Sequence, residues 1–232
     1  MSGILHHVAT ARQGLALEAR LFGSTEQGVC VWTAKSQAIV CPASYRRLDG
    51  FADLGTSGAA PGWPVATRPT GGGAVPQGPG VLNLALALTV PRGFSIEDGY
   101  TILTGILSDA LSEFADDLGP GPTPNSFCDG TWNLTIGGRK VAGTAQRWRP
   151  LSGGRNRVLA HALVLVDVDI DDAVQAVTML NKHLGLPPVR PEMHVTLREH
   201  RGSGLEEETL AAGLFHAAIA RLEAQDQHSD AA

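Results

Sequence analysis

The sequence predicts an α+β fold with a mainly antiparallel sheet and packed helices. Short runs rich in β-branched residues outnumber the amphipathic helical segments, and several of these runs are joined by tight turns. No internal repeat is present. We expect a single domain over residues 1–225, followed by a polar tail at 226–232.

The N-terminal part is expected to hold a helix, a hairpin and a second helix. Leucine and alanine recur among charged residues from Ala9 to Phe22, which is typical of a short helix, and Gly23 marks its end. Val29–Thr33 and Gln37–Cys41 are β-rich runs with a short connection, which indicates a hairpin. Pro42–Leu54 has the pattern of a helix.

The middle of the chain places three consecutive glycines between two strands. Pro64–Arg68 is predicted as one strand and Val81–Val90 as a second, buried one, with Gly71–Gly73 between them. Apolar residues then recur at helical spacing over Ser95–Leu118. This is the clearest helix in the sequence.

The C-terminal part begins with a break in regular structure at Gly119–Pro124, which is rich in proline. Trp132–Ile136 is then extended, and the pair Gly137–Gly138 predicts a two-residue hairpin turn because glycine adopts positive φ without steric cost. The return strand carries Lys140 close to that turn. The other predicted elements are a strand at Val158–Asp169 and helices at Ile170–Leu184 and Leu205–Ala224.

Composition and charge exclude several classes of function. The chain has 232 residues, of which 43% are hydrophobic, and this is enough apolar surface for a core. The net charge of −5 argues against a general nucleic-acid-binding protein, because such proteins carry a basic surface. The apolar runs are shorter than the roughly 20 residues that span a bilayer. The first residues lack a signal-peptide pattern, so we expect a cytoplasmic protein that binds neither nucleic acid nor membrane.

The three cysteines differ in their surroundings. Cys30, Cys41 and Cys128 are an odd number without a CxxC pair, which argues against a disulfide framework and against a zinc site. Cys30 and Cys41 lie in apolar strands and are interpreted as small core residues. Cys128 lies on a polar, glycine-containing loop upstream of Lys140, where a thiol can act as a nucleophile.

The segment Arg68–Val75 and the segment Gly137–Gln146 carry the strongest chemical signal. Three consecutive glycines let backbone N–H groups converge on an anion, although a purely structural glycine turn fits the composition equally well. Neither a Walker loop nor a Rossmann turn is present. A guanidinium such as that of Arg68 can hold a carboxylate or phosphate, or it can be a solvated strand-end group. Lys140, among small and apolar neighbours, is either a fixed positive charge or a surface lysine.

Four motifs occur in the order Arg68-x-x-Gly-Gly-Gly-Ala-Val75, Gly80-x-x-Asn83, Gly138-Arg-Lys-Val-Ala-Gly-x-Ala-Gln146 and Leu159-x-His161. In this order they resemble the catalytic domain of the lipoate-protein ligase and octanoyltransferase family. The resemblance covers nearly the whole chain. It implies a catalytic domain related to the biotin-protein ligase core, with a class II synthetase-like fold. It further implies attachment of a lipoyl or octanoyl group to a lysine of a lipoyl domain or of the glycine-cleavage carrier protein.

The resemblance also implies roles for individual residues. Lys140 matches the lysine of the family that contacts the acyl carbonyl and phosphate, and Cys128 matches the nucleophile of the transferase branch. Where many ligases carry an aromatic residue and a histidine, this chain has Pro76-Gln77, so no role of that histidine is carried over. No metal ligands are expected. The implied substrate-binding residues are Arg68, Gly71, Gly72, Gly73, Ala74, Val75, Asn83, Gly143, Ala145 and His161.

Two chemistries share this scaffold. Transfer through a Cys128 thioester needs no cofactor, whereas a ligase forms a lipoyl-AMP intermediate and needs ATP and Mg²⁺. The intact Gly71–Gly73 favours the ligase, while the segment Ser126–Gly130 and the length of the chain favour the transferase, which is the preferred prediction. A non-catalytic protein that binds lipoate or a lipoyl domain is the alternative from another class.

Overall fold

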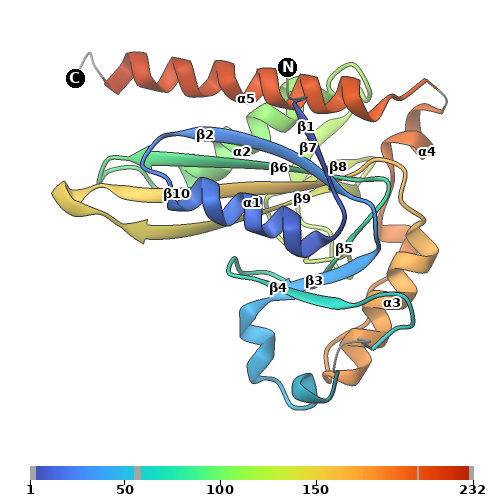
Figure 1. Cartoon of the computed structure of the whole chain (residues 1–232). Coiled ribbons are helices and arrows are strands. Elements are labelled where there is room, and N and C mark those ends of the chain that lie inside the picture. The colour runs from blue at the N-terminus through green and yellow to red at the C-terminus, as the bar shows by residue number, and fades with distance from the viewer. Residues whose placement is uncertain (1–3, 55–58, 203, 230–232) are drawn as a thin grey trace.

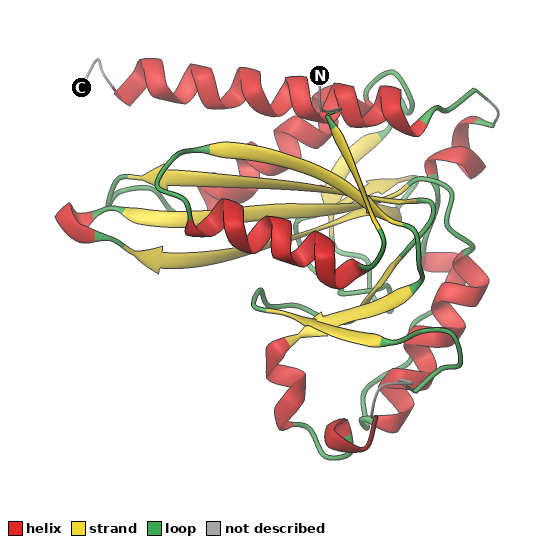
Figure 2. Ribbon diagram, viewed as in Figure 1, coloured by secondary structure: helices red, strands yellow, loops and turns green. Residues whose placement is uncertain are grey.

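The structure is a computed structural model that describes residues 4–54, 59–202 and 204–229. Within these residues, the larger sheet consists of β1 (Leu5–Val8), β2 (Gly28–Ala34), β6 (Val81–Val90), β7 (Leu118–Gly121), β8 (Asn133–Ile136), β9 (Arg139–Pro150) and β10 (Asn156–Leu165). Its order is β1-β2-β6-β10-β9-β8-β7, and only β1 and β2 pair parallel. The prediction of an α+β fold with a mainly antiparallel sheet is confirmed (Figures 1 and 2).

A smaller sheet lies below the larger one in the view of Figure 1. It consists of β3 (Ala38–Pro42), β4 (Val65–Arg68) and β5 (Val75–Gln77), in the order β4-β3-β5. Strand β4 is parallel to β3, and β5 is antiparallel to it. The predicted glycine run therefore connects two strands of this small sheet.

Side-chain alternation gives the large sheet two different faces. On β6, Leu82, Leu84 and Leu86 belong to the main hydrophobic core, whereas Asn83 and Ala85 point to the opposite face. Strand β10 follows the same rule, since alternate residues enter the main core and His161 lies on the opposite face. The polar residues of the candidate site thus share one face of the sheet.

Helices α2 (Ile96–Leu111) and α5 (Glu207–Ser229) cover the main-core face (Figure 1). Helix α2 begins with a capping box, in which Ser95 Oγ accepts from the Asp98 N–H at 3.1 Å and the Asp98 carboxylate accepts from the Ser95 N–H at 2.8 Å. Leu103, Ile106 and Leu107 then point into the core with no exposed surface. Their burial holds this helix against the sheet.

The opposite face is covered by α1 (Ala11–Gly23) and by the small sheet, as Figure 2 shows. Helix α3 (Ile170–His183) packs on the small sheet through a second hydrophobic cluster that includes Ile39 and Trp63. The remaining helical segments are α4 (Leu197–Arg201) and the 3-10 helices Ala43–Arg47, Phe51–Leu54, Ser152–Gly154 and Pro191–Met193.

The predicted hairpin of Val29–Thr33 with Gln37–Cys41 is wrong. Both segments are strands, but β2 pairs with β1 and β6, whereas β3 pairs with β4 and β5 of the other sheet. The local sequence pattern identified the strands and could not identify their partners, because pairing depends on distant segments. The turn at Gly137–Gly138 is confirmed, with φ values of 56° and 75°.

Three predicted helices have different limits in the structure. Pro42–Leu54 forms two short 3-10 helices, because Gly50 between them has a φ of 80° that interrupts any helix. The helix predicted over Ser95–Leu118 ends at Leu111, and Leu118–Gly121 is strand β7. Pro120 is compatible with β7 because this is the edge strand of the sheet. Helix α5 continues to Ser229 within the predicted tail, and 230–232 lie outside the described residues.

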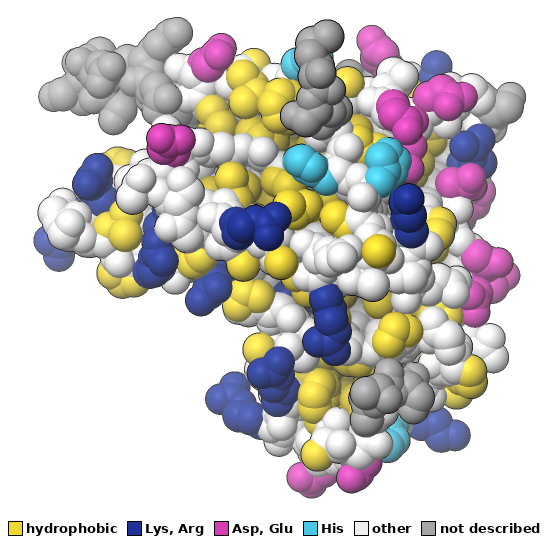
Figure 3. Space-filling view, in the orientation of Figure 1, with side chains coloured by type: hydrophobic (Ala, Val, Ile, Leu, Met, Phe, Trp, Pro, Cys, Tyr) yellow, Lys and Arg dark blue, Asp and Glu magenta, His cyan; other side chains and the backbone are white. Residues whose placement is uncertain are grey.

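The visible surface carries both charges. In Figure 3, Asp and Glu side chains lie mainly along the top and right of the molecule, and Lys and Arg side chains are spread over the whole visible face. No helix among the described residues has the length and apolarity needed to cross a membrane.

Gly14 of α1 is a test of the close packing between this helix and the large sheet. A Cβ at this position would meet the Trp32 ring at 2.2 Å, and Trp32 is fully buried. We expect Gly14→Ala to lower the free energy of unfolding by about 1–3 kcal/mol, because overpacking outweighs the gain in helix propensity. Chemical denaturation measures this change. Gly23→Ala is the matched control, since a Cβ there meets nothing within 4 Å, and an equal loss in both variants would contradict the interpretation.

Candidate active site

A cavity lies on the face of the large sheet that carries Asn83 and His161. The empty space within its walls and its open mouth, part of it open to solvent, is about 430 Å³. Most of its surface is apolar, with polar groups from α1, the small sheet and the Cys128 loop. The lining residues are Leu15, Glu18, Trp32, Val40, Arg68, Val75, Gln77, Asn83, Cys128, Gly143, Thr144, Ala145, His161, Ala162 and Leu163.

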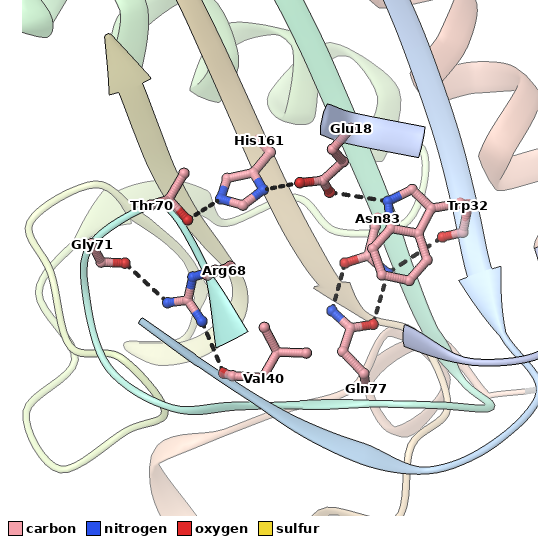
Figure 4. Close-up of polar contacts among 9 residues, drawn as sticks. All are labelled: Glu18, Trp32, Val40, Arg68, Thr70, Gly71, Gln77, Asn83 and His161. Atoms are coloured by element: carbon pink, nitrogen blue, oxygen red, sulfur yellow. Dashed lines mark hydrogen bonds and ion pairs between the residues drawn. The ribbon is translucent and has the colours of Figure 1, made fainter. Parts of the chain in front are cut away.

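A chain of hydrogen bonds crosses one side of the cavity (Figure 4). Thr70 Oγ1 lies 3.0 Å from His161 Nε2, and His161 Nδ1 lies 2.9 Å from Glu18 Oε2. The other Glu18 oxygen accepts from Trp32 Nε1 at 3.0 Å. Glu18 is only 4% exposed, so this carboxylate depends on its partners for stabilisation. His161, predicted as a substrate-binding residue, lines the cavity with both ring nitrogens in hydrogen bonds.

Asn83 forms a second buried polar pair. Its amide nitrogen donates to Gln77 Oε1 at 2.9 Å, and the Gln77 amide nitrogen donates back to Asn83 Oδ1 at 2.7 Å. The Asn83 amide nitrogen is also 3.3 Å from the Trp32 carbonyl oxygen. Gln77, which in the sequence was only a departure from the ligase pattern, therefore fixes the side chain of Asn83, a predicted site residue.

Arg68 organises the glycine loop. Nη1 donates to the Val40 carbonyl at 2.9 Å and Nη2 donates to the Gly71 carbonyl at 3.0 Å (Figure 4). Nη2 also donates to the Gly73 carbonyl at 2.7 Å. Arg68 is 4% exposed. The interpretation as a solvated strand-end arginine is wrong, because burial and these three bonds fix the guanidinium inside the protein. In this structure it binds the backbone carbonyls of the loop.

Gly72 and Gly73 allow the glycine loop to approach Cys128. Gly72 has a φ of 95°, and a Cβ there would lie 2.3 Å from Cys128 Sγ. A Cβ at Gly73 would lie 3.1 Å from Cys128 Cα, whereas one at Gly71 meets nothing within 4 Å. Arg68 Nη2 also lies 4.0 Å from Cys128 Sγ. The glycine loop and the candidate nucleophile, which are distant in sequence, therefore form a single site.

Cys128 has an unusual backbone conformation, with a φ of 52° in the left-handed region. This conformation is uncommon for residues other than glycine and needs support from its surroundings. Lys140 Nζ donates to the carbonyls of Phe127 and Cys128, the latter at 3.0 Å. On the other side, the Phe127 N–H donates to His194 Nε2 at 2.8 Å. Lys140 and His194 together hold the turn that presents the thiol.

Lys140 has no exposed surface, so its alternative interpretation as a surface lysine is wrong. Burial lowers the pKa of Lys140 to about 8, and the nearby Cys128 opposes this shift. The lysine is therefore mostly protonated at pH 7. A Cβ at Gly143 would lie 2.9 Å from both Cε and Nζ of Lys140, so glycine at this position makes room for the lysine side chain.

The other two thiols are chemically different from Cys128. Cys30 and Cys41 are 7% and 0% exposed. Burial raises the pKa of Cys30 to about 12 and that of Cys41 to about 11. Their interpretation as core residues is confirmed. Cys128 is partly exposed and lines the cavity, so it is the accessible thiol.

The structure brings most of the predicted site residues together. Arg68, Val75, Asn83, Cys128, Gly143, Ala145 and His161 line the cavity. Gly71 and Gly72 line a second cavity beside it, and Ala74 is buried in the core of the small sheet. Lys140 lies beneath the Cys128 turn. Within the described residues, no group of three or more His, Cys, Asp or Glu side chains has the arrangement of a metal site.

Several residues of this site were not predicted from the sequence, above all Glu18, Trp32 and His194. One signal was available for Glu18, because Gly14, Glu18 and Phe22 recur at helical spacing and are all buried. A carboxylate on the buried face of a short helix requires a partner in the interior. No local pattern marked His194, whose contact with Phe127 spans 67 residues.

Comparison with known proteins identifies the family. The family model named lipoyl protein ligase A/B catalytic domain matches residues 56–213, more than half of the chain. This protein therefore belongs to the lipoyl protein ligase A/B catalytic-domain family, as the sequence motifs predicted.

Similar sequences come from several bacteria. A protein of Cupriavidus necator, named only as uncharacterized, is 41% identical over 149 residues, which cover 59% of this chain and 58% of that protein. An octanoyl-[GcvH]:protein N-octanoyltransferase of Kyrpidia tusciae is 34% identical over 142 residues, covering 59% and 49%. A lipoyl-[GcvH]:protein N-lipoyltransferase of Listeria monocytogenes is 36% identical over 87 residues, covering 37% and 31%. The match spans about half the length of the first two relatives.

Solved structures share the fold. A lipoate-protein ligase A bound with ATP has a TM-score of 0.72 at 16% identity, covering 96% of this chain and 86% of that chain. A bipartite lipoate protein ligase from Thermoplasma acidophilum has a TM-score of 0.65 at 16% identity, covering 96% and 84%. The predicted biotin/lipoate-protein ligase fold is thus confirmed.

Gly72 tests the contact between the glycine loop and the thiol. Gly72→Ala places a methyl group against Cys128 Sγ, at a φ that disfavours alanine. We expect alkylation of Cys128 by iodoacetamide to slow roughly tenfold or more, because displacements of about 1 Å are costly in well-oriented sites. Peptide mass spectrometry follows the reaction. Gly71→Ala is the comparison variant and should slow it much less; equal rates for both variants would disprove the contact.

His194 gives a pH-dependent contribution to stability. Burial, together with the charge of Lys140, lowers the pKa of His194 from 6.5 to about 4. The unfolded chain therefore takes up a proton below about pH 6.5 before the folded protein does, so stability falls as the pH drops from 6.5 to 4. Over this pH range we expect the free energy of unfolding to fall by up to about 3 kcal/mol more in the wild type than in His194→Gln. Urea unfolding of both proteins across this range measures the difference, and parallel curves would contradict it.

Proposed function

We propose that this protein transfers a lipoyl or octanoyl group to a lysine of an acceptor protein through a thioester on Cys128. The observation that carries the proposal is the position of Cys128, a partly exposed thiol held at the wall of a mostly apolar cavity by a positive-φ turn. Family membership and the names of the transferase relatives support the same reaction.

The first step would load the enzyme. Cys128 Sγ attacks the carbonyl carbon of the acyl donor, the bond from that carbon to the sulfur or nitrogen of the donor breaks, and the leaving group takes up the thiol proton. The guanidinium of Arg68, 4.0 Å from Sγ, carries a charge opposite to that of the attacking thiolate. The apolar cavity receives the acyl chain, and the relatives' names point to a lipoyl or octanoyl group.

The second step would release the acyl group. The amine of the acceptor lysine attacks the thioester carbon, the carbon–sulfur bond breaks, and the proton lost from nitrogen restores the thiol. We infer a lipoyl domain as the acceptor and the glycine-cleavage carrier protein as a further partner, because the relatives' names describe an acyl group carried on GcvH and transferred to a protein. Lys140 supports both steps, because its hydrogen bonds to the carbonyls of Phe127 and Cys128 hold the turn that carries the thiol. No cofactor is required in this route.

An ATP-dependent ligase is the second candidate, since a structural relative was solved with ATP. That route would need ATP and Mg²⁺. Magnesium in such sites is held mainly by substrate phosphates and one or two carboxylates, so the donor set of this chain does not decide between the routes. The contact of Gly72 and Gly73 with Cys128 favours the transferase, because it gives the glycine run a role in presenting the thiol.

Cys128→Ser provides the direct test. We expect the variant to lose octanoyl transfer to a lipoyl-domain acceptor by at least about 10³-fold, because hydroxyl and thiol differ greatly in nucleophilicity at neutral pH. Wild-type protein mixed with S-octanoyl-N-acetylcysteamine should gain one octanoyl group on Cys128, detected by mass spectrometry. The matched control is Cys41→Ser, in which the accessible thiol is retained and the octanoyl adduct should still form.

The same mixtures separate the candidate functions. If Cys128→Ser loads the acceptor at the wild-type rate with ATP, Mg²⁺ and lipoate, the thioester mechanism is refuted and the ligase holds. If neither an acyl-Cys128 adduct nor an acyl-AMP forms under any of these conditions, a non-catalytic binding protein is the remaining candidate.

A further inference from the structure

A second cavity lies beside the mostly apolar cavity described above, and Cys128 lies in the walls of both. The two share Cys128, Thr144 and Ala145 in their walls. Their surfaces differ, because the first is mostly apolar whereas the second is more polar than apolar. The second is lined by Gly71, Gly72, Tyr100, Cys128, Asp129, Gly130, Thr131, Trp132, Asn133, Thr144, Ala145 and Gln146.

Two features of this second cavity suit a cation. Tyr100 and Trp132 both line it and stack with ring centroids 5.5 Å apart and planes at 5°, so part of its wall is aromatic. Asp129 is exposed, and one of its carboxylate oxygens accepts from the Thr123 N–H at 2.8 Å, which fixes the carboxylate at the cavity. An aromatic wall and a carboxylate together attract an ammonium group.

The enzyme's own nearby lysine, Lys140, does not occupy the second cavity. Lys140 is the nearby ammonium, and it donates to the carbonyls of Phe127 and Cys128 from beneath the turn. Its side chain has no exposed surface. Asp129 and Cys128 both line the second cavity, whereas Lys140 does not.

We propose that the second cavity binds the side chain of the acceptor lysine, with the aliphatic part along Trp132 and Tyr100 and the nitrogen near Asp129. This rests on the proposed function, because it assumes that an acyl thioester forms on Cys128. The acyl chain then occupies the first cavity and the amine arrives from the second, so the thioester carbon lies between them. The acyl chain and the acceptor lysine thus approach the Cys128 sulfur from different cavities.

The chemistry of the step fits this arrangement. The lysine arrives as an ammonium and loses one proton to solvent before it attacks. The free amine forms the new carbon–nitrogen bond, the carbon–sulfur bond breaks, and the second proton ends on sulfur. Asp129 raises the local concentration of the cation, and the aromatic wall directs the chain toward Cys128.

The experiment separates loading of Cys128 from its unloading. Purified full-length protein is first loaded with S-octanoyl-N-acetylcysteamine, and Nα-acetyl-lysine methylamide is then added as the acceptor. Mass spectrometry follows the formation and the loss of acyl-Cys128. We expect Asp129→Asn and Trp132→Leu to load at rates within twofold of wild type, and to transfer to the lysine probe at least tenfold more slowly.

Controls identify the cause of any slow transfer. Hydroxylamine, a small neutral nucleophile, should release the acyl group from wild type and variants at similar rates, which shows that the thioester itself is intact. Asp116→Asn removes an exposed carboxylate outside both cavities and should transfer normally. Trp132→Phe keeps an aromatic ring and should recover most of the transfer rate lost in Trp132→Leu.

The outcomes are distinct. Transfer to the lysine probe at the wild-type rate in both Asp129→Asn and Trp132→Leu would overturn the assignment of the second cavity while leaving the thioester mechanism in place. A wild-type protein that never forms acyl-Cys128 would overturn the proposed function, and the lysine site with it.

Discussion

The contact on which the candidate site most depends is the ammonium of Lys140 bound to the carbonyls of Phe127 and Cys128. The left-handed conformation of Cys128 is costly for a residue with a side chain, and a buried charge is costly without partners. Each cost is offset by the same contact. The lysine satisfies two carbonyls of a strained turn, and these carbonyls give the buried ammonium its hydrogen bonds. His194 completes the turn from the other side through the Phe127 N–H.

The Cys128 turn also explains why the loop at Gly71–Gly73 contains glycine. Gly72 and Gly73 approach Cys128 so closely that a Cβ at either position would meet its atoms, and Arg68 fixes the loop by binding its carbonyls. Residues of the two motifs that dominate the sequence therefore both contact Cys128, which meets Gly72 and Gly73 of one motif and Lys140 of the other. The consequence is a thiol fixed between an apolar cavity and a polar one, which suits a group that is loaded from one side and unloaded from the other.

Buried polar groups along the apolar cavity tie this face of the sheet together. Glu18, His161 and Trp32 come from a helix and two strands, and each depends on the others for its hydrogen bonds (Figure 4). Leaving one of them without a partner would expose the full desolvation cost of a buried polar group. This network therefore links the position of α1 to the strands that carry the site, and it keeps the cavity wall in one arrangement.

The sequence by itself determined the fold class, most of the strands and helices, the Gly137–Gly138 turn and the motifs of the family, because periodicity, turn residues and short motifs are local properties. It also marked Cys128, Lys140, Arg68 and Asn83 as site residues. Only the tertiary structure decided that β2 and β3 enter different sheets, that Arg68 binds backbone carbonyls and that Lys140 lies beneath the Cys128 turn. These facts depend on contacts between segments far apart in the chain, such as His194 with Phe127, and no local pattern encodes which distant partner a buried polar group will find.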